Sequence, residues 1–328
     1  MIEKQFPKSG AGVLSFKEGL KVIWSFNIIF LAVFVLFLPS AKAQRLIVVE
    51  KSARVLSLYE DNRLINTFPC SLGWNPHQPK TREGDGATPE GLYRISDKHP
   101  SQRYYLFLEI SYPNLKDIQR AYWEGRLSAE QYQEYCKGLL TETPVEGPLG
   151  GNIGIHGGGL FRSTPEGLQR DWTYGCIALK NKDIEVVYRF ASVGTPVLIY
   201  DASKPLFDIF SQLVTVKTRS LLLKSEPWAA EFEMFFPQVM IRLILKENHW
   251  GNRRLWIWGY EPGSGRLLFW IVDRNGNGYL EPLDKFKNWG PEVWSYRAVK
   301  RIILQYLPQW ISRQEEKRRG EPLKWSVP

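Results

Sequence analysis

The sequence predicts a mostly-β (α+β) domain with a helical insertion at residues 44–202 and a small α+β domain at residues 203–328. The length of 328 residues suggests two folded units, at about 100–200 residues per domain. Short apolar runs separated by turn residues dominate the first unit, which is typical of β-strands. The composition then changes, since nine of the 13 tryptophans lie in 203–328, where 20 basic and 13 acidic residues leave a net charge of +7.

The composition also excludes several classes of protein. A chain with 44% hydrophobic and 23% charged residues is globular rather than disordered. Three cysteines are too few for a disulfide-dense scaffold, and the chain has no C-x-x-C motif of the kind found in zinc ribbons.

Residues 1–43 are typical of an export signal. An apolar stretch from Val22 to Leu38 follows a basic leader, and Ala41-Lys42-Ala43 fits the small-x-small pattern for cleavage after Ala43. An uncleaved N-terminal anchor is the alternative, because the stretch is only slightly short for a transmembrane helix. Both alternatives predict a periplasmic or cell-envelope location.

The first unit is expected to contain short strands, a helical insertion and one further helix. Strands are predicted at 45–50, 54–59, 64–70, 92–96, 104–111, 153–156, 177–179 and 194–200. The insertion at about 115–148 carries a helical pattern in two pieces, which Gly125 separates and Ser128 restarts as an N-cap. This insertion fits either a lid over a cleft or an amphipathic cover of the sheet. Asn181 is predicted to cap a helix from 182 to about 191.

The second unit is expected to contain a hairpin and a long helix. Leu255–Tyr260 and Leu267–Val272 flank a Pro/Gly/Ser turn and predict the hairpin. Pro291 suits the first position of a helix that runs to about Arg313, and residues 315–328 are expected to fray. The basic, Trp-rich composition indicates contact with an anionic polymer or lipid headgroups, or else a solvated face over a Trp-filled core.

His156 and Cys176 form the strongest candidate for a catalytic site. Both follow or precede short apolar runs, and both are surrounded by glycines, which a buried pair without chemistry would not need. A neighbouring imidazolium would lower the pKa of the thiol as an ion pair and would supply a general acid. Gly175 is expected to leave the N–H groups of the turn free to bind an oxyanion.

Other enzyme classes that use similar groups do not fit this chain. His156-Gly-Gly-Gly159 is similar to the oxyanion loop of lipases, but the chain contains no G-x-S-x-G elbow. A papain-like enzyme has its cysteine before its histidine, whereas this chain has the reverse order. A sortase-like enzyme shares this order, but its Thr-x-Thr-Cys motif is absent.

The sequence around the candidate pair resembles the L,D-transpeptidase (YkuD) catalytic domain. His156 is followed by a spacer of 16 residues and then by Thr173-Tyr174-Gly175-Cys176. Four further motifs occur in the family's order: Thr88-Pro89-Glu90-Gly91 with Tyr93-Arg94-Ile95, Ile110-Ser111-Tyr112-Pro113-Asn114, Asn181-x-Asp183-Ile184 and Gly194-Thr195-Pro196-Val197. The resemblance covers about 45–200 and implies an L,D-transpeptidase-like sandwich.

The resemblance implies a cysteine transpeptidase that acts on peptidoglycan stem peptides and requires no cofactor. Cys176 would attack the L-centre carbonyl of diaminopimelate and expel D-alanine, and an amine of a second stem would resolve the acyl-enzyme into a 3-3 cross-link. His156 would act as general base and acid, with its ring oriented by the Gly157 carbonyl. The N–H groups of Gly175 and Cys176 would form the oxyanion hole.

Tyr174, Thr173, Gly158 and Tyr112 are the candidate substrate-binding residues. The chain departs from the family at two positions near the nucleophile: Tyr174 stands where many members have histidine, and Ala178 where many have arginine. Both departures leave the catalytic pair intact but affect the choice of substrate and acceptor. Cys70 and Cys136 either form a disulfide or remain two buried thiols.

Residues 273–284 fit the spacing of a calcium loop. Asp273, Asn275, Asn277, Tyr279 and Asp284 occupy the ligand positions 1, 3, 5, 7 and 12. Position 12 is Asp rather than Glu, and the side-chain ligands include only two carboxylates, so any binding should be weak. A plain Asn-Gly turn between a strand and a helix is the alternative.

Three hypotheses for function follow. The first is an exported transpeptidase. The second is a hydrolase of the same scaffold that releases lipoprotein or D-alanine, and the third is a non-catalytic wall-binding protein. The expected partners are peptidoglycan and, through the basic second unit, an outer-membrane lipoprotein or an anionic envelope polymer. No nucleic-acid partner is expected, because the chain is predicted to be exported.

Overall fold

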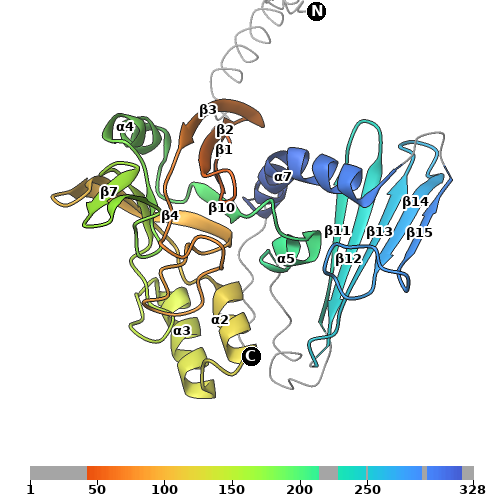
Figure 1. Cartoon of the computed structure of the whole chain (residues 1–328), viewed down its shortest axis with the longest axis horizontal. Helices are drawn as coiled ribbons and strands as arrows, with labels where there is room; N and C mark the ends of the chain where they lie inside the picture. Colours follow the sequence, from red (N-terminus) through yellow and green to blue (C-terminus); the bar gives the residue numbers. More distant parts are fainter. Residues whose placement is uncertain (1–42, 214–227, 249, 290–293, 320–328) are drawn as a thin grey trace, which may run out of the picture. The chain divides into compact units, whose positions relative to one another are not determined.

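The computed structural model describes residues 43–213, 228–248, 250–289 and 294–319 (Figure 1). The predicted export signal or anchor lies outside these residues except for Ala43, and so do Pro291 and the end of the tail at 320–328. Among the residues that are described, no helix is both long and apolar enough to cross a membrane.

A mixed eight-stranded sheet is the framework of the first unit. Its strands are β1 (Arg45–Glu50), β2 (Val55–Glu60), β3 (Arg63–Pro69), β4 (Gly91–Ser101), β5 (Tyr105–Ile110), β6 (Gly154–His156), β9 (Ile177–Ala178) and β10 (Pro196–Tyr200). They lie in the order β3-β2-β1-β10-β4-β5-β6-β9. Neighbours are antiparallel, except that β1 pairs with β10 and β6 with β9 in parallel. The prediction of a mostly-β first unit is confirmed.

β1 is buried on both faces of the sheet, and its side chains alternate between two hydrophobic clusters. Ile47 and Val49 belong to the cluster that α4 (Asn181–Phe190) covers. Leu46 and Val48 point to the opposite face and belong to a cluster shared with the C-terminal residues. A strand that is covered on both sides needs an unbroken apolar run, which Leu-Ile-Val-Val supplies.

The insertion forms α2 (Leu115–Trp123) and α3 (Ala129–Thr141), which confirms the two predicted helical pieces. Ser128 caps α3 as predicted: its Oγ accepts a hydrogen bond from the N–H of Gln131, whose side chain accepts one from the N–H of Ser128. A small hydrophobic cluster that includes Ile118 and Tyr135 joins the two helices.

A short exposed hairpin between His156 and Cys176 was not predicted. It consists of β7 (Phe161–Thr164) and β8 (Gly167–Arg170), which pair in antiparallel register. Its four-residue strands are too short and too polar to give a clear alternating pattern in the sequence.

The described C-terminal residues form a five-stranded antiparallel meander with two helices. The strands are β11 (Trp228–Phe235), β12 (Met240–Glu247), β13 (Arg253–Tyr260), β14 (Leu267–Asp273) and β15 (Lys285–Asn288); the helices are α5 (Leu206–Ser211) and α7 (Tyr296–Arg319). The predicted hairpin of β13 and β14 is confirmed. The other strands were missed, although Glu231-Phe232-Glu233-Met234 alternates clearly.

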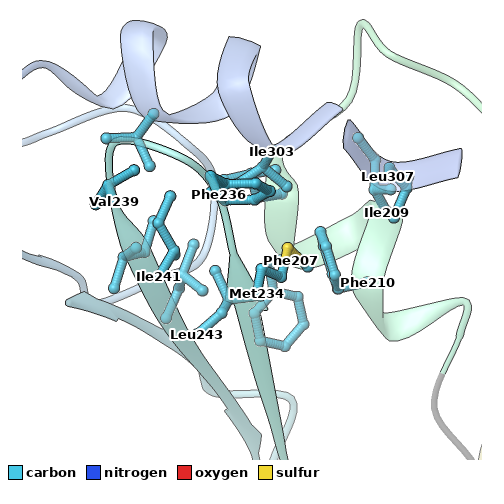
Figure 2. Packing of buried hydrophobic residues seen from close by; sticks show 14 of the residues in the cluster. Phe207, Ile209, Phe210, Met234, Phe236, Val239, Ile241, Leu243, Ile303 and Leu307 are labelled. Atoms are coloured by element: carbon cyan, nitrogen blue, oxygen red, sulfur yellow. The ribbon is translucent and has the colours of Figure 1, made fainter. Parts of the chain in front are cut away.

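One face of this meander carries the largest hydrophobic cluster among the described residues. Figure 2 shows side chains from α5, such as Phe210, and from α7, such as Ile303, gathered around Ile241 and Leu243 of β12. Leu243 and its cross-strand partner Ile257 of β13 are both fully buried there. The side chains between them along each strand point to the opposite face.

Because burial differs between the two faces, neighbouring residues of β12 should differ in their contribution to stability. Leu243→Ala should lower the free energy of unfolding by about 2–5 kcal/mol, since it leaves a cavity in a packed cluster. Ile244→Ala, one residue along and half-buried on the other face, is the matched control and should cost much less. Chemical denaturation measures both values, and equal losses would contradict the assignment of the two faces.

Candidate active site

The parallel pair β6 and β9 brings His156 and Cys176 together at one edge of the eight-stranded sheet. In its register, Ile155 pairs with Ile177 and His156 with Ala178. Because side chains alternate along a strand, Cys176 lies on the same face as Ala178 and therefore as His156. Both side chains line one cleft of about 590 Å³, a volume typical of small-molecule sites.

The ring of His156 is fixed by one hydrogen bond and three aromatic neighbours. Its Nδ1 lies 2.6 Å from the carbonyl oxygen of Gly157, so Nδ1 carries the proton and Nε2 is left unprotonated. Tyr104 stacks on the ring at a centroid distance of 4.2 Å, with Phe107 at 5.7 Å and Trp172 at 5.8 Å. His156 is 1% exposed, so its ring has little room to rotate.

Burial favours the neutral forms of both catalytic candidates. It lowers the pKa of His156 to about 4, although the Gly157 carbonyl acts in the opposite direction. It raises the pKa of the Cys176 thiol to about 11, although a hydrogen bond from the backbone of Gly154 favours the thiolate and lowers this pKa. The structure therefore favours a neutral thiol and a neutral imidazole over the predicted ion pair.

The Cys176 thiol is half-buried and its hydrogen bond goes to the backbone rather than to the imidazole. Its Sγ lies 3.7 Å from the carbonyl oxygen of Asn152, a residue with a φ of 53° that also lines the cleft. In an unliganded site, a bond between nucleophile and base commonly tightens only when substrate binds.

The Thr173 hydroxyl holds the turn before Cys176. Its Oγ1 accepts a hydrogen bond from the N–H of Gly175 at 3.1 Å and donates one to the carbonyl of Cys176 at 2.7 Å. The N–H of Gly175 is therefore used inside the turn, and its predicted place in an oxyanion hole is wrong for this conformation. The N–H of Cys176 makes no hydrogen bond to the described residues and is free to bind an oxyanion.

Gly175 is required at its position by a close approach of two backbone segments. Its φ is 124°, and an added Cβ would lie 2.6 Å from the carbonyl oxygen of Ala87. The loop that carries Ala87 is held by the buried ammonium of Lys51, which donates to the Thr88 carbonyl at 3.0 Å and pairs with Glu90 at 2.7 Å. The Thr-Pro-Glu-Gly motif thus packs against the turn that precedes Cys176.

The glycine loop after His156 is held by a residue that was predicted to cap a helix. The Oδ1 of Asn181 accepts a hydrogen bond from the N–H of Gly158 at 2.8 Å. Asn181 is the first residue of α4, whose N-cap Lys180 makes no side-chain capping bond. The Asn181 prediction was therefore wrong in its role, because the side chain turns toward the loop of the candidate site.

Two arginines make the cleft cationic. The guanidinium of Arg162, on β7, lies 4.0 Å from the ring centroid of Trp172, and that of Arg103 lies 5.2 Å from the ring of Tyr104. Neither forms an ion pair with another described residue, and both lower the pKa of His156. An anionic ligand would therefore complement the charge of the cleft.

Comparison with known proteins relates residues 44–199 to one protein family. A family model described as the L,D-transpeptidase catalytic domain (YkuD) matches residues 44–199. Residues 44–199 belong to this family. No curated protein matches the chain.

Solved structures that are similar to the chain carry the same description. An L,D-transpeptidase from Mycobacterium smegmatis is 15% identical over 48% of this chain and 59% of that chain, with a TM-score of 0.29. An L,D-transpeptidase from Mycobacterium tuberculosis is 14% identical over 48% of this chain and 58% of that chain, with a TM-score of 0.29. One from Xylanimonas cellulosilytica is 14% identical over 49% of this chain and 63% of that chain, with a TM-score of 0.28. The chain thus covers less than two thirds of each.

The predicted substrate-binding residues of this L,D-transpeptidase domain divide into two pairs. Thr173 and Tyr174 line the cleft, and Tyr174 is 73% exposed there. Gly158 and Tyr112 lie outside the cleft lining. Tyr112 is buried in the core, where its hydroxyl donates to the Leu149 carbonyl at 3.2 Å, so the prediction that it contacts substrate is wrong.

Several residues that line the cleft of the L,D-transpeptidase domain were missed in the sequence. They are Arg103, Tyr104, Phe107, Asn152, Arg162 and Trp172. The register of β5 against β6 pairs Phe107 with His156. Tyr104 precedes β5, and Trp172 lies in the connection between β8 and β9. None of the described residues of the insertion lines the cleft, so the lid alternative has no support here.

The two remaining cysteines form no disulfide. Cys70 is buried in the core, where burial raises the pKa of its thiol to about 12, and Cys136 is a half-buried residue of α3. The alternative of two free thiols is confirmed, although only Cys70 is fully buried.

The calcium-like loop connects β14 to a strand, β15, rather than to a helix. Asp273 is fully buried, and its carboxylate accepts hydrogen bonds from the N–H groups of Gly276 and Gly278, both at 2.7 Å. Asp284 accepts from the N–H groups of Arg274 and Glu281. No group of three or more His, Cys, Asp or Glu residues in the described part of the chain is arranged to hold a metal. Calcium binding remains a prediction.

The low pKa of His156 should make the stability of the domain depend on pH. The pKa of about 4 in the folded protein lies below the ordinary value of 6.5. The contribution of His156 to the free energy of unfolding is therefore complete above pH 6.5 and is lost as the pH falls through about 4. The difference between the two pKa values corresponds to about 3 kcal/mol of this free energy.

Denaturation of wild type and His156→Gln at neutral pH and near pH 4 measures this contribution. The wild type should lose about 3 kcal/mol more than the variant over this range. Parallel pH profiles for the two proteins would contradict a neutral, buried His156.

Proposed function

We propose that this protein is a cysteine L,D-transpeptidase that acts on peptidoglycan stem peptides outside the cytoplasmic membrane. The observation that carries the proposal is the placement of Cys176 and His156 on one face of β6 and β9, in one cleft of a domain from this family. Export through the N-terminal segment and a periplasmic or cell-envelope location belong to the same proposal, because the substrate lies there.

In the first step, the hydrogen bond between His156 and Gly157 decides the direction of proton transfer. Because Nδ1 holds its proton against the Gly157 carbonyl, Nε2 is free to take the proton of the Cys176 thiol. The sulfur then bonds to the L-centre carbonyl carbon of diaminopimelate, and the carbonyl oxygen becomes an oxyanion. The free N–H of Cys176 is placed to donate to that oxygen.

In the second step, the intermediate collapses to a thioester and the bond to D-alanine breaks. The imidazolium of His156 returns its proton to the leaving amine, so the pair is neutral again. An amine of a second stem then attacks the thioester, His156 accepts its proton, and the thiol is restored. The product is a 3-3 cross-link, and an amine of a lipoprotein would give an attached protein by the same steps.

Arg103 and Arg162 support recognition of a carboxylate on the stem peptide. Their charges are unpaired within the described residues, and guanidinium groups bind carboxylates in a bidentate manner. A bound carboxylate would also offset the charges that lower the pKa of His156. Substrate binding would therefore raise this pKa and make Nε2 a stronger base when it is needed.

Replacing the nucleophile should remove all products from a muropeptide digest. The Cys176→Ala variant should give none, and His156→Gln should be slower by about 10²–10⁴-fold, because it loses the proton acceptor. Cys136→Ala removes a thiol outside the cleft and is the matched control, which should keep its activity. Mass spectrometry should show dimers linked through two diaminopimelates. Shortened stems without dimers would identify a hydrolase instead, and products from Cys176→Ala would contradict the site.

Removing either cleft arginine should weaken substrate binding more than turnover. Arg103→Gln and Arg162→Gln should each raise KM for a stem tetrapeptide by about tenfold, since a charge-assisted hydrogen bond is lost. The acid limb of the pH profile should also move to higher pH, because each arginine lowers the pKa of His156. Arg189→Gln, an exposed arginine of α4, is the charge-matched control. Unchanged KM and pH profiles would contradict this role.

A further inference from the structure

The C-terminal sheet has a second face that no described residue covers. The face that carries Leu243, Ile257 and Ile271 packs against α5 and α7 (Figure 2). Trp256, Trp258 and Trp270, which alternate with these residues along β13 and β14, are only half-buried. We call this second face the Trp face and define it by Arg242, Ile244, Trp256, Trp258, Trp270 and Lys287.

The strand register arranges the Trp face as a row across four strands. Arg242 pairs with Trp258, Trp258 with Trp270, and Trp270 with Lys287. With strands about 4.8 Å apart, the row spans about 14 Å and places two indoles between two cations. Trp256 lies two residues before Trp258 on the same face and extends the aromatic surface along β13.

The placement of these tryptophans is not explained by the core. The cluster under α7 is built mainly from Leu, Ile, Val and Phe side chains, with Trp294 as its one tryptophan below 9% exposure. A Trp-filled core, the alternative from the sequence, therefore does not account for Trp256, Trp258 and Trp270. Three large aromatic side chains on a face that no described residue covers are a feature of binding surfaces rather than of solvated ones.

The charge of the face is mostly positive. Lys246, Arg254 and Lys285 lie on the same side of their strands as Arg242 and Lys287. The acidic residues on this side are Glu231 and Glu233, of which Glu231 is already paired with Arg242. A ligand that complements the face therefore has flat apolar surfaces for the indoles and carboxylates for the surrounding cations.

We propose that the Trp face binds the glycan strand of peptidoglycan, with the indoles under the sugar rings and the cations at carboxylates of the stems. A pyranose ring presents a face of C–H bonds that suits the electron-rich face of an indole. The five cations complement the carboxylates that the stem peptides carry along the strand. This inference rests on the proposed function, since it takes as ligand the polymer on which the catalytic cleft would act.

Binding is tested with the full chain carrying Cys176→Ala, so that no turnover changes the polymer. This protein should sediment with insoluble peptidoglycan, and added salt should weaken the binding because the cations are exposed. Trp258→Ala with Trp270→Ala should weaken it by about tenfold or more. Trp250→Ala, which removes a 76% exposed tryptophan from the turn between β12 and β13, is the matched control. Thermal unfolding checks that every variant is folded.

Three results would overturn the inference. The first is equal sedimentation of the folded double variant and the control. The second is binding to vesicles of anionic phospholipid, but not to peptidoglycan, through the same tryptophans. The third is a dimer in solution that the double variant abolishes. Because the binding assay uses Cys176→Ala and the function assay uses muropeptide products, failure of one does not imply failure of the other.

Discussion

The parallel pairing of β6 with β9 is the contact on which the rest of the site depends. Its register sets Cys176 and His156 on one face, and the chain between them must leave the sheet and return. That connection carries the glycine loop, the hairpin of β7 and β8, and the Thr173 turn. Consequently one pairing positions His156, Cys176 and the arginine of the hairpin, Arg162, around a single cleft.

Burial is the second constraint, and it determines the resting charge of the pair. The aromatic wall of Tyr104, Phe107 and Trp172 buries the imidazole, and burial lowers its pKa. Burial also raises the pKa of the Cys176 thiol. A neutral pair resists oxidation and alkylation, because the thiolate is the reactive species. In the proposed mechanism, attack by the thiol therefore requires proton transfer to Nε2, which the Gly157 hydrogen bond keeps available.

The sequence was sufficient for local features and insufficient for those that depend on register. Strands with unbroken apolar runs such as β1, the Ser128 cap and the pair of His156 and Cys176 are encoded in a few adjacent residues, and they were predicted. The aromatic wall, the arginines of the cleft and the role of Asn181 depend on which strands pair. The sequence correctly predicted that the turn needs glycine at position 175, but for the wrong reason. The close approach to Ala87 requires the glycine, and the N–H of Gly175 is not free.

Burial predicts that, without substrate, Cys176 is a neutral thiol and His156 a neutral imidazole. Titration of the thiolate absorbance in the ultraviolet, as the difference between the wild type and Cys176→Ala, tests it directly. The expected result is a single transition near pH 11 that belongs to Cys176, with almost no thiolate at neutral pH. A substantial thiolate signal at neutral pH, which disappears in His156→Gln, would show an ion pair and contradict the claim.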